Sequence, residues 1–223
     1  MRRKRRSYFL YIVESPSDND LFEKRTEGNL LLEALRLAQV SNPTQAHVEY
    51  RLVVSVDSFD RALLKDLPKK LNELKGLTPI LHLSMHGDKR GLQLTDGTEV
   101  NWDELAKLLS EINRNFAKNE LIVCVSACRG FYGGFMPLFD RRRRPFKVLV
   151  GPMNQPRWDD AAVAYATFYH LLMDKGRSVE TSVNAMRIAS GNQMFQSTIP
   201  EELLAWVRRQ SKKRSNIRVE GIQ

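Results

Sequence analysis

The chain has 223 residues, of which 42% are hydrophobic and 27% are charged, and its formal net charge is +9. This length suits one domain with a full core, and because no flexible Gly/Ser linker divides it, we expect a single domain over residues 1–223. No apolar run approaches the roughly 18 residues that a membrane span needs. The Arg-rich start also lacks the apolar region and cleavage site of a signal peptide, so the sequence predicts a cytoplasmic protein that spans no membrane.

The positive charge is concentrated in three segments, which are Arg2 to Arg6, Arg141 to Arg144 and Lys212 to Arg214. Two of these segments predict basic ends, namely a flexible N-terminus at about 1–6 and a C-terminal tail at about 211–223. Solvation of these ends is the simpler explanation of the charge. Contact with nucleic acid or another acidic partner is the less favoured alternative.

Strands and helices alternate almost throughout the sequence, which is typical of a sheet with helices on its faces. In the first half we expect strands at 7–14 and 47–56 and helices at 30–39 and 59–74. A Ser-Pro-Ser-Asp turn after the first strand can cap the next element. The first helix follows Gly28 and is broken by Asn42-Pro43, and the second should stop or kink near Pro68. In the second half we expect a strand at 78–87, a hairpin at 92–100, a helix at 102–115 capped by Asn101, strands at 121–125 and 146–150, a loop with a short helix at 131–139, and helices at 159–174, 178–189 and 201–210. The sequence therefore predicts an α/β fold with a mostly parallel sheet flanked by helices on both faces.

Two of these strands end in chemically useful side chains. The Leu121–Val125 run has no polar alternation, as in a strand covered on both faces, and it leads to Cys128, while the 78–87 strand leads to His86. Because ligands bind beyond the carboxyl ends of parallel strands, a thiol and an imidazole at one edge predict a Cys–His dyad. Cys124 is expected in the core, and at about 13 Å along an extended strand it is too far from Cys128 for a disulfide.

The same residues carry a resemblance to a known family. LSMHGD at 83–88 and VSACRG at 125–130 resemble caspase-like (clan CD) cysteine peptidases, and more closely their CHAT branch, which is related to separases. The caspase signature is Gln-Ala-Cys-Arg/Gln/Gly-Gly with a histidine about 50 residues upstream, and here His86 precedes Cys128 by 42 residues. The resemblance, best over 77–189, implies a caspase-like fold, His86 and Cys128 as catalytic residues, and an oxyanion hole made by the backbone N–H groups of Gly87 and Cys128.

The resemblance also bears on specificity. Ser126 stands where caspases carry the glutamine that helps line the substrate pocket, and where metacaspases carry an aspartate, so cleavage after aspartate is not expected. In CHAT and separase relatives, the stretch that matches GPMNQPRWDD helps shape the primary pocket, which makes Trp158, Asp159 and Asp160 candidates. A carboxylate there would select Lys or Arg, so we expect cleavage after a basic or long unbranched residue. Alternatively, Asp159 or Asp160 caps the helix that begins there.

The function that this resemblance implies is a cysteine endopeptidase that cuts a partner protein in bacterial (antiphage) defence or regulated cell death. Because the sequence has no sensor repeats, we expect a separate regulatory or sensor protein. We expect no cofactor and no metal, since His82 and His86, four apart on a strand, are too distant to share an ion. The FDRRRRP loop is expected to be exposed, either as a self-cleavage site at 140–145 or as a solvated turn.

Two alternatives come from other classes of protein. YIVESPSDND at 11–20 resembles the first strand of Toprim domains, whose glutamate, here Glu14, would serve a Mg²⁺-dependent nuclease. That chemistry needs a carboxylate pair at a later strand end, and neither Val56-Asp57 nor His86-Gly87-Asp88 supplies one. The second alternative is a catalytically silent interaction module with the same fold.

Overall fold

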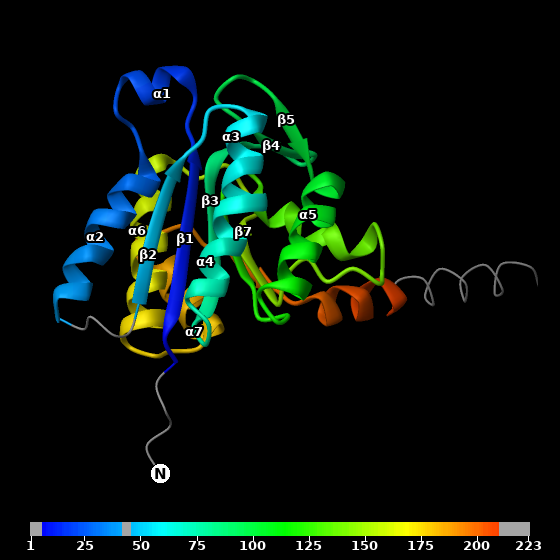
Figure 1. Ribbon diagram of the computed structural model, residues 1–223. Helices are drawn as coiled ribbons and strands as arrows, with labels where there is room; N and C mark the ends of the chain where they lie inside the picture. The colour runs from blue at the N-terminus through cyan, green and yellow to red at the C-terminus, as the bar shows by residue number, and fades with distance from the viewer. Residues whose placement is uncertain (1–5, 42–45, 210–223) are drawn as a thin grey trace, which may run out of the picture.

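The computed structural model describes residues 6–41 and 46–209, so the Asn42-Pro43 break and nearly all of the predicted basic ends lie outside it. Its central sheet has the strand order β2-β1-β3-β6-β7-β8, in which β8 is antiparallel to β7 and the other neighbours are parallel (Figure 1). These strands are β1 (Tyr8–Ser15), β2 (Ala46–Leu52), β3 (Thr78–Gly87), β6 (Ile122–Ser126), β7 (Val148–Pro152) and β8 (Phe195–Thr198). The predicted mostly parallel sheet is confirmed.

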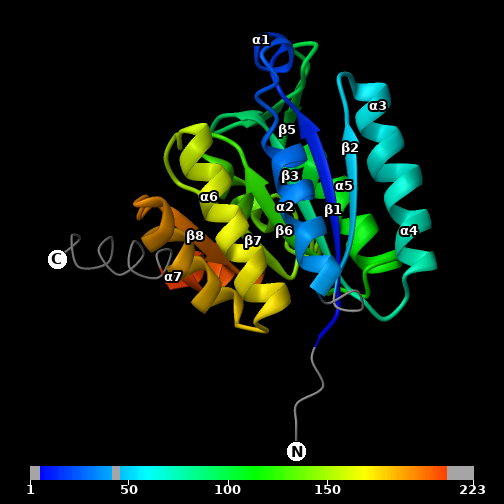
Figure 2. The ribbon, with the colours of Figure 1, turned by 90° about the vertical axis from the view of Figure 1, so that its left-hand side faces the viewer.

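Helices cover both faces of this sheet, as the sequence predicts (Figure 2). Along β1, Phe9 and Tyr11 belong to one core while Leu10 and Ile12 belong to the other, because successive strand residues point to opposite faces. The first core packs against α3, α4 and α5, and the second packs against α2, α6 and α7. These helices are α2 (Glu27–Ser41), α3 (Val56–Asp60), α4 (Leu67–Glu73), α5 (Trp102–Asn115), α6 (Trp158–Tyr169) and α7 (Val179–Ser190). No helix in the described part of the chain is long and apolar enough to cross a bilayer.

The irregularity predicted near Pro68 takes the form of a π-helical turn. This turn, Arg61–Asp66, joins α3 to α4, and at its end the N–H of Leu67 reaches the carbonyl oxygen of Ala62. Pro68 lies in the first turn of α4, where its missing N–H costs little. A second π-helical turn, His170–Asp174, extends α6 to the residue at which the sequence predicts the helix to end.

The hairpin predicted after the histidine strand is also present. It consists of β4 (Gly91–Gln93) and β5 (Glu99–Asn101), with Gly97 at φ +85° in the turn between them. Asn101 then caps α5, since its side chain accepts from the backbone N–H of Glu104 at 3.0 Å while the Glu104 carboxylate accepts from the N–H of Asn101 at 3.2 Å. This capping box fixes the helix start at the predicted residue.

Three features differ from the expectations drawn from the sequence. The helix α2 begins at Glu27 rather than after Gly28, because the N–H of Gly28 donates to the buried Glu14 carboxylate at 2.7 Å and so satisfies one of the free amide groups of the first turn. A short helix, α1 (Asp18–Phe22), precedes it, with Ser17 as its N-cap. The edge strand β8 was not predicted, since its sequence FQST lacks the apolar alternation of a typical strand.

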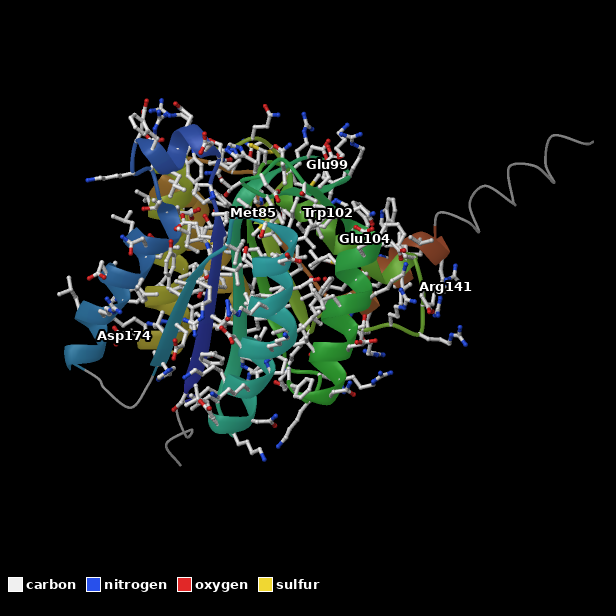
Figure 3. The ribbon with its side chains drawn as sticks, turned by 45° about the horizontal axis from the view of Figure 1, so that its top comes forward. Met85, Glu99, Trp102, Glu104, Arg141 and Asp174 are labelled. Atoms are coloured by element: carbon white, nitrogen blue, oxygen red, sulfur yellow. The ribbon has the colours of Figure 1, made fainter. Side chains whose placement is uncertain are left out.

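The carboxyl ends of the parallel strands meet at the top of Figure 1, where α1 and the β4–β5 hairpin also lie. Figure 3 tilts this edge toward the viewer and shows Met85, Glu99 and Trp102 gathered around the end of β3 and the hairpin. Trp102 is buried, and its Nε1–H donates to the carbonyl oxygen of Lys89 at 3.0 Å, which ties the start of α5 to the turn between β3 and β4. Ligands of open parallel sheets bind at this edge.

Candidate active site

The pairing of β3 with β6 brings the two candidate catalytic residues to the same place. The strands are parallel neighbours, with Ser84 opposite Ser126 at the end of the ladder. His86 lies near the end of β3, Cys128 lies in the turn directly after β6, and both residues line the same two hollows. Because neighbouring strands lie about 4.7–4.9 Å apart, an imidazole and a thiol leave the sheet side by side.

Cys128 is held at a tight turn directly after β6. The next residue, Arg129, adopts the left-handed conformation with φ 60°, and its N–H donates to the carbonyl oxygen of Asn154 at 2.7 Å. Gly130 allows no side chain, because an added Cβ would lie 2.5 Å from the carbonyl oxygen of Val125. A non-glycine residue at positive φ is uncommon and is often found at functional sites, where the surrounding structure holds it in place.

The thiol of Cys128 is half-buried in this turn. Burial raises its pKa above the usual range, and the positive charge of Arg129 only partly opposes the effect. The resting side chain is therefore a neutral thiol at pH 7. Since the thiolate is the effective nucleophile, Cys128 needs a neighbouring base to take its proton during attack.

The imidazole of His86 has two contacts that set its orientation. Its Nε2 lies 3.0 Å from Oδ2 of Asp20, which belongs to α1. Its ring also meets the ring of Trp158 edge to face, with centroids 6.0 Å apart and an interplanar angle of 90°. Burial alone would raise the pKa of Asp20, but hydrogen bonds from Ser17 and His86 outweigh it and hold that pKa below its usual range.

Two hollows flank the dyad, and both His86 and Cys128 line each of them. The wider hollow, of about 300 Å³, lies on the side of the hairpin. Its remaining walls are formed by Gly87, Asp88, Arg90, Gly91, Leu92, Gln93, Glu99, Asn101 and Gln155. Gly87 must be small here, because an added Cβ would lie 2.9 Å from the carbonyl oxygen of Gly91 across the hairpin.

The narrower hollow, of about 60 Å³, lies on the side of α6. Predicted candidates Ser126 and Trp158 both line it. The other lining residues are Glu27, Met85, Ala127, Pro156, Arg157 and Ala161. The hollow therefore has mostly apolar walls with one carboxyl group, that of Glu27, and one basic side chain, that of Arg157, which is paired with Asp159.

Glu27 is nearly inaccessible to solvent, yet its carboxyl group is well hydrogen-bonded. The hydroxyl of Ser126 donates to it at 2.7 Å, and the hydroxyl of Ser84 donates to it at 2.8 Å. Burial raises the pKa of Glu27 to about 7, an effect that the two serine hydrogen bonds oppose and the nearby Glu14 carboxylate reinforces. Near neutral pH this group exchanges between a charged and a neutral form.

The predicted acids Asp159 and Asp160 lie outside the walls of both hollows. Asp159 is exposed and receives two hydrogen bonds from the guanidinium of Arg157, at 3.0 and 2.9 Å. Both acids belong to the first turn of α6, where a negative charge interacts favourably with the helix dipole. Neither acid is the N-cap, which is Arg157, so the alternative in which one of them caps this helix is not what the structure shows.

Sequence reasoning missed Asp20 and Glu27 as residues of the site. Each lies more than 55 residues from its partner on β3, so no local spacing connects them. The available signal was chemical: both are acids that come shortly after the end of β1, Asp20 in α1 and Glu27 at the start of α2. Glu27 also occupies the first turn of an amphipathic helix, which gives an ordinary structural explanation for an acid there.

Glu14, the acid of the nuclease alternative, and Cys124 both lie in the core. Glu14 is fully buried and accepts from Gly28, Asn29 and the hydroxyl of Tyr50, so its carboxylate does not face a substrate. Cys124 is fully buried, and burial raises its pKa to about 12. Within the described ranges, no group of three or more His, Cys, Asp or Glu side chains is placed to hold a metal ion.

Comparison with known proteins identifies the fold. No protein-family model and no curated protein matches the chain. Among solved structures, it is similar to a secreted C11 cysteine protease from Bacteroides thetaiotaomicron in complex with an irreversible peptide inhibitor, with a TM-score of 0.54 and 14% identity over 80% of this chain and 57% of that one. It is also similar to the Arg-specific cysteine proteinase gingipain R, with a TM-score of 0.49 and 10% identity over 83% of this chain and 44% of that one.

The chain spans about half the length of these two structures, and both belong to clan CD cysteine proteases. The predicted caspase-like fold is confirmed by the likeness to the C11 protease. The closer assignment to the CHAT branch stays a prediction.

Proposed function

We propose that the protein is a cysteine endopeptidase in which His86 and Cys128 form the catalytic dyad. The observation that carries this proposal is the β3–β6 register, which sends an imidazole and a thiol out of one edge of the sheet between two hollows. A structural role for both residues is less suited to these surroundings, because buried structural cysteines lie in the core, as Cys124 does.

The proposed reaction has two halves. In the first, His86 takes the thiol proton, the Cys128 sulfur bonds to the carbonyl carbon of the substrate, and the amide C–N bond breaks as His86 returns the proton to the departing amine. In the second, His86 takes a proton from water, the resulting hydroxide attacks the thioester, and the C–S bond breaks to release the acid and restore the thiol. The sum is hydrolysis of one peptide bond.

The tetrahedral intermediates of both halves carry a negative oxygen that needs hydrogen-bond donors. The backbone N–H groups of Gly87 and Cys128 are the proposed donors, as the family resemblance implies. Gly87 lies on the wall of the wider hollow, where the absence of a side chain lets a substrate approach the backbone.

The narrower hollow is the proposed pocket for the residue that precedes the cut. Ser126 and Trp158 line it as the sequence predicts, while its acidic group comes from Glu27 in place of Asp159 or Asp160. Its mostly apolar walls suit the methylene groups of a long unbranched side chain, and an ionised Glu27 would hold a terminal cation. We therefore keep the proposal of cleavage after a basic or long unbranched residue, with Lys or Arg favoured.

The biological setting is implied by the CHAT resemblance alone. In this proposal the protein acts in the cytoplasm, cuts a partner protein during bacterial defence or regulated cell death, and is controlled by a separate regulatory or sensor protein.

The test compares newly formed protein N-termini in bacterial cells that produce the wild type, Cys128→Ala or His86→Ala at equal levels. New N-termini in the wild type alone would support the dyad and would also reveal the residue before each cut. If the same N-termini persist in Cys128→Ala, the nucleophile assignment fails. Loss of DNA or RNA that depends on Mg²⁺ and survives Cys128→Ala would favour the nuclease alternative instead.

A further inference from the structure

The contact between Asp20 and His86 has a consequence for how the dyad works. Asp20 is the second of its helix's two acids, and unlike its exposed neighbour Asp18 it is buried, with its carboxylate directed at the imidazole. An ionised carboxylate has no hydrogen to donate, so in this pair Nε2 of His86 must be the donor. In the neutral ring, Nδ1 is then the nitrogen that carries the free lone pair.

This distinction matters because a neutral imidazole has one nitrogen with a hydrogen and one without it. A general base must present the bare nitrogen to the thiol, so the wrong tautomer cannot accept its proton. An acceptor fixed on Nε2 keeps the bare nitrogen at Nδ1 in every catalytic cycle. It also stabilises the imidazolium that forms when the thiol proton arrives.

Asp20 is itself held in place by two other residues, Ser17 and Arg25. The hydroxyl of Ser17 donates to Oδ2 of Asp20 at 2.5 Å, while Oγ of Ser17 accepts from the Asp20 N–H at 3.1 Å. The guanidinium of Arg25 lies 3.7 Å from Oδ1, and the backbone N–H of Arg25 donates to the carbonyl oxygen of Asp20 at 2.8 Å. These contacts leave the Asp20 carboxylate few alternative positions. A fixed carboxylate can in turn fix the orientation of the His86 ring.

We propose that Asp20 is a positioning residue that extends the dyad to a carboxylate–imidazole–thiol triad, with Nδ1 of His86 as the base. The inference rests on the proposed peptidase function. It assigns the short helix α1 a role in catalysis, because α1 follows β1 in the chain and its Asp20 contacts His86 near the end of β3.

The first experiment reads the tautomer directly and needs no substrate. Long-range ¹H–¹⁵N spectra of the ¹⁵N-labelled wild type, recorded where the ring is neutral and assigned with His86→Ala, should show hydrogen on Nε2 and a bare Nδ1. The same spectra of Asp20→Asn should lose this preference, because an amide can either accept from the ring or donate to it. Hydrogen on Nδ1 in the wild type would overturn the proposal.

The second experiment measures peptide cleavage by Asp20→Asn, with Asp18→Asn as the matched control on the same helix. We expect kcat to fall about 10²–10³-fold with KM nearly unchanged in the first variant, and no change in the second. A kcat within threefold of wild type, or a loss of kcat with an unaltered tautomer, would overturn the role of Asp20. If the wild type cleaves no peptide, the function itself fails, while the spectra still decide the Asp20 contact.

Discussion

Ser84 of β3 and Ser126 of β6 lie directly opposite each other, and their hydroxyl groups both donate to the carboxyl group of Glu27. The pair therefore anchors an acid from α2 beneath the two strand ends that carry His86 and Cys128. Glu27 also lines the narrower hollow. The hydrogen bonds of Ser84 and Ser126 to Glu27 therefore connect the ends of β3 and β6 to the proposed specificity pocket.

The first prediction concerns specificity. Glu27→Gln keeps the size of the side chain and one oxygen that can accept from both serine hydroxyls, but removes its charge. We expect the preference for Lys or Arg over a long uncharged residue before the cut to fall about 10–100-fold, which corresponds to a charge-assisted hydrogen bond of roughly 1.5–3 kcal/mol. A peptide library profiled with both proteins measures this ratio.

The matching comparison is Asp159→Asn, which removes the acid that is exposed beside Arg157. If that variant loses the basic preference and Glu27→Gln keeps it, the specificity assignment returns to Asp159. Strict cleavage after aspartate by the wild type would contradict both assignments.

The second prediction concerns stability as a function of pH. The pKa of Glu27 is raised from 4.5 to about 7 by folding, so between these values the unfolded chain ionises while the folded protein keeps its proton. The contribution of Glu27 to stability is therefore greatest below pH 4.5, declines as pH rises to about 7, and is constant above that. The full decline is on the order of 3 kcal/mol.

Urea denaturation of the wild type and Glu27→Gln at several pH values measures this contribution as a difference. The variant mimics the protonated acid, so its stability relative to the wild type should increase from pH 4.5 to pH 8. A difference that is flat across this range would show that Glu27 titrates normally in the folded protein.

The third prediction separates the two cysteines. Cys124→Ala should leave peptide cleavage measurable, because its thiol is fully buried and its pKa is raised to about 12. The variant should lose about 1–2 kcal/mol of stability from the cavity it leaves in the core. Cys128→Ala should fold with little change in thermal midpoint and lose all cleavage. The opposite pattern of activity would move the nucleophile to Cys124.

The elements that carry His86 and Cys128 were predictable because their signals are local. β3 has the predicted bounds, Thr78–Gly87. Its apolar residues stop just before His86, which lies at the carboxyl end of the strand. The Asp96-Gly97 turn and the Asn101 cap likewise depend on neighbouring residues, and both occur where the sequence places them. Local patterns therefore predicted the elements that carry the two candidate residues.

The residues that support the dyad were not predictable from local patterns. Asp20 and Glu27 act through contacts with β3 and β6 that only the tertiary fold creates. The strand β8 was missed for a similar reason, since its pairing with β7 supplies the stabilisation that its short polar sequence lacks. Asp159 stays a predicted candidate; in the structure its carboxylate accepts from the guanidinium of Arg157, and Asp159 itself lines neither hollow.

The last prediction concerns the arginine-rich loop at 140–145. The structure places Arg141, Arg142 and Arg144 at the surface, with Arg143 half-buried between Asp103 and Asp140 and Arg144 paired with Glu201. Exposed loop backbone is what a protease needs in order to bind a segment in extended form. If the narrower hollow accepts a basic side chain, Arg141 and Arg142 should be the favoured sites of self-cleavage.

Intact-mass measurement of concentrated wild-type protein should then reveal a fragment that ends at residue 141 or 142, while Cys128→Ala stays intact until a small amount of wild type is added. Replacing both arginines by Gln should protect the chain without lowering cleavage of an added peptide, because the loop lies outside the lining of both hollows. A fully active preparation that contains only the intact chain would show that processing of this loop is not required for activity.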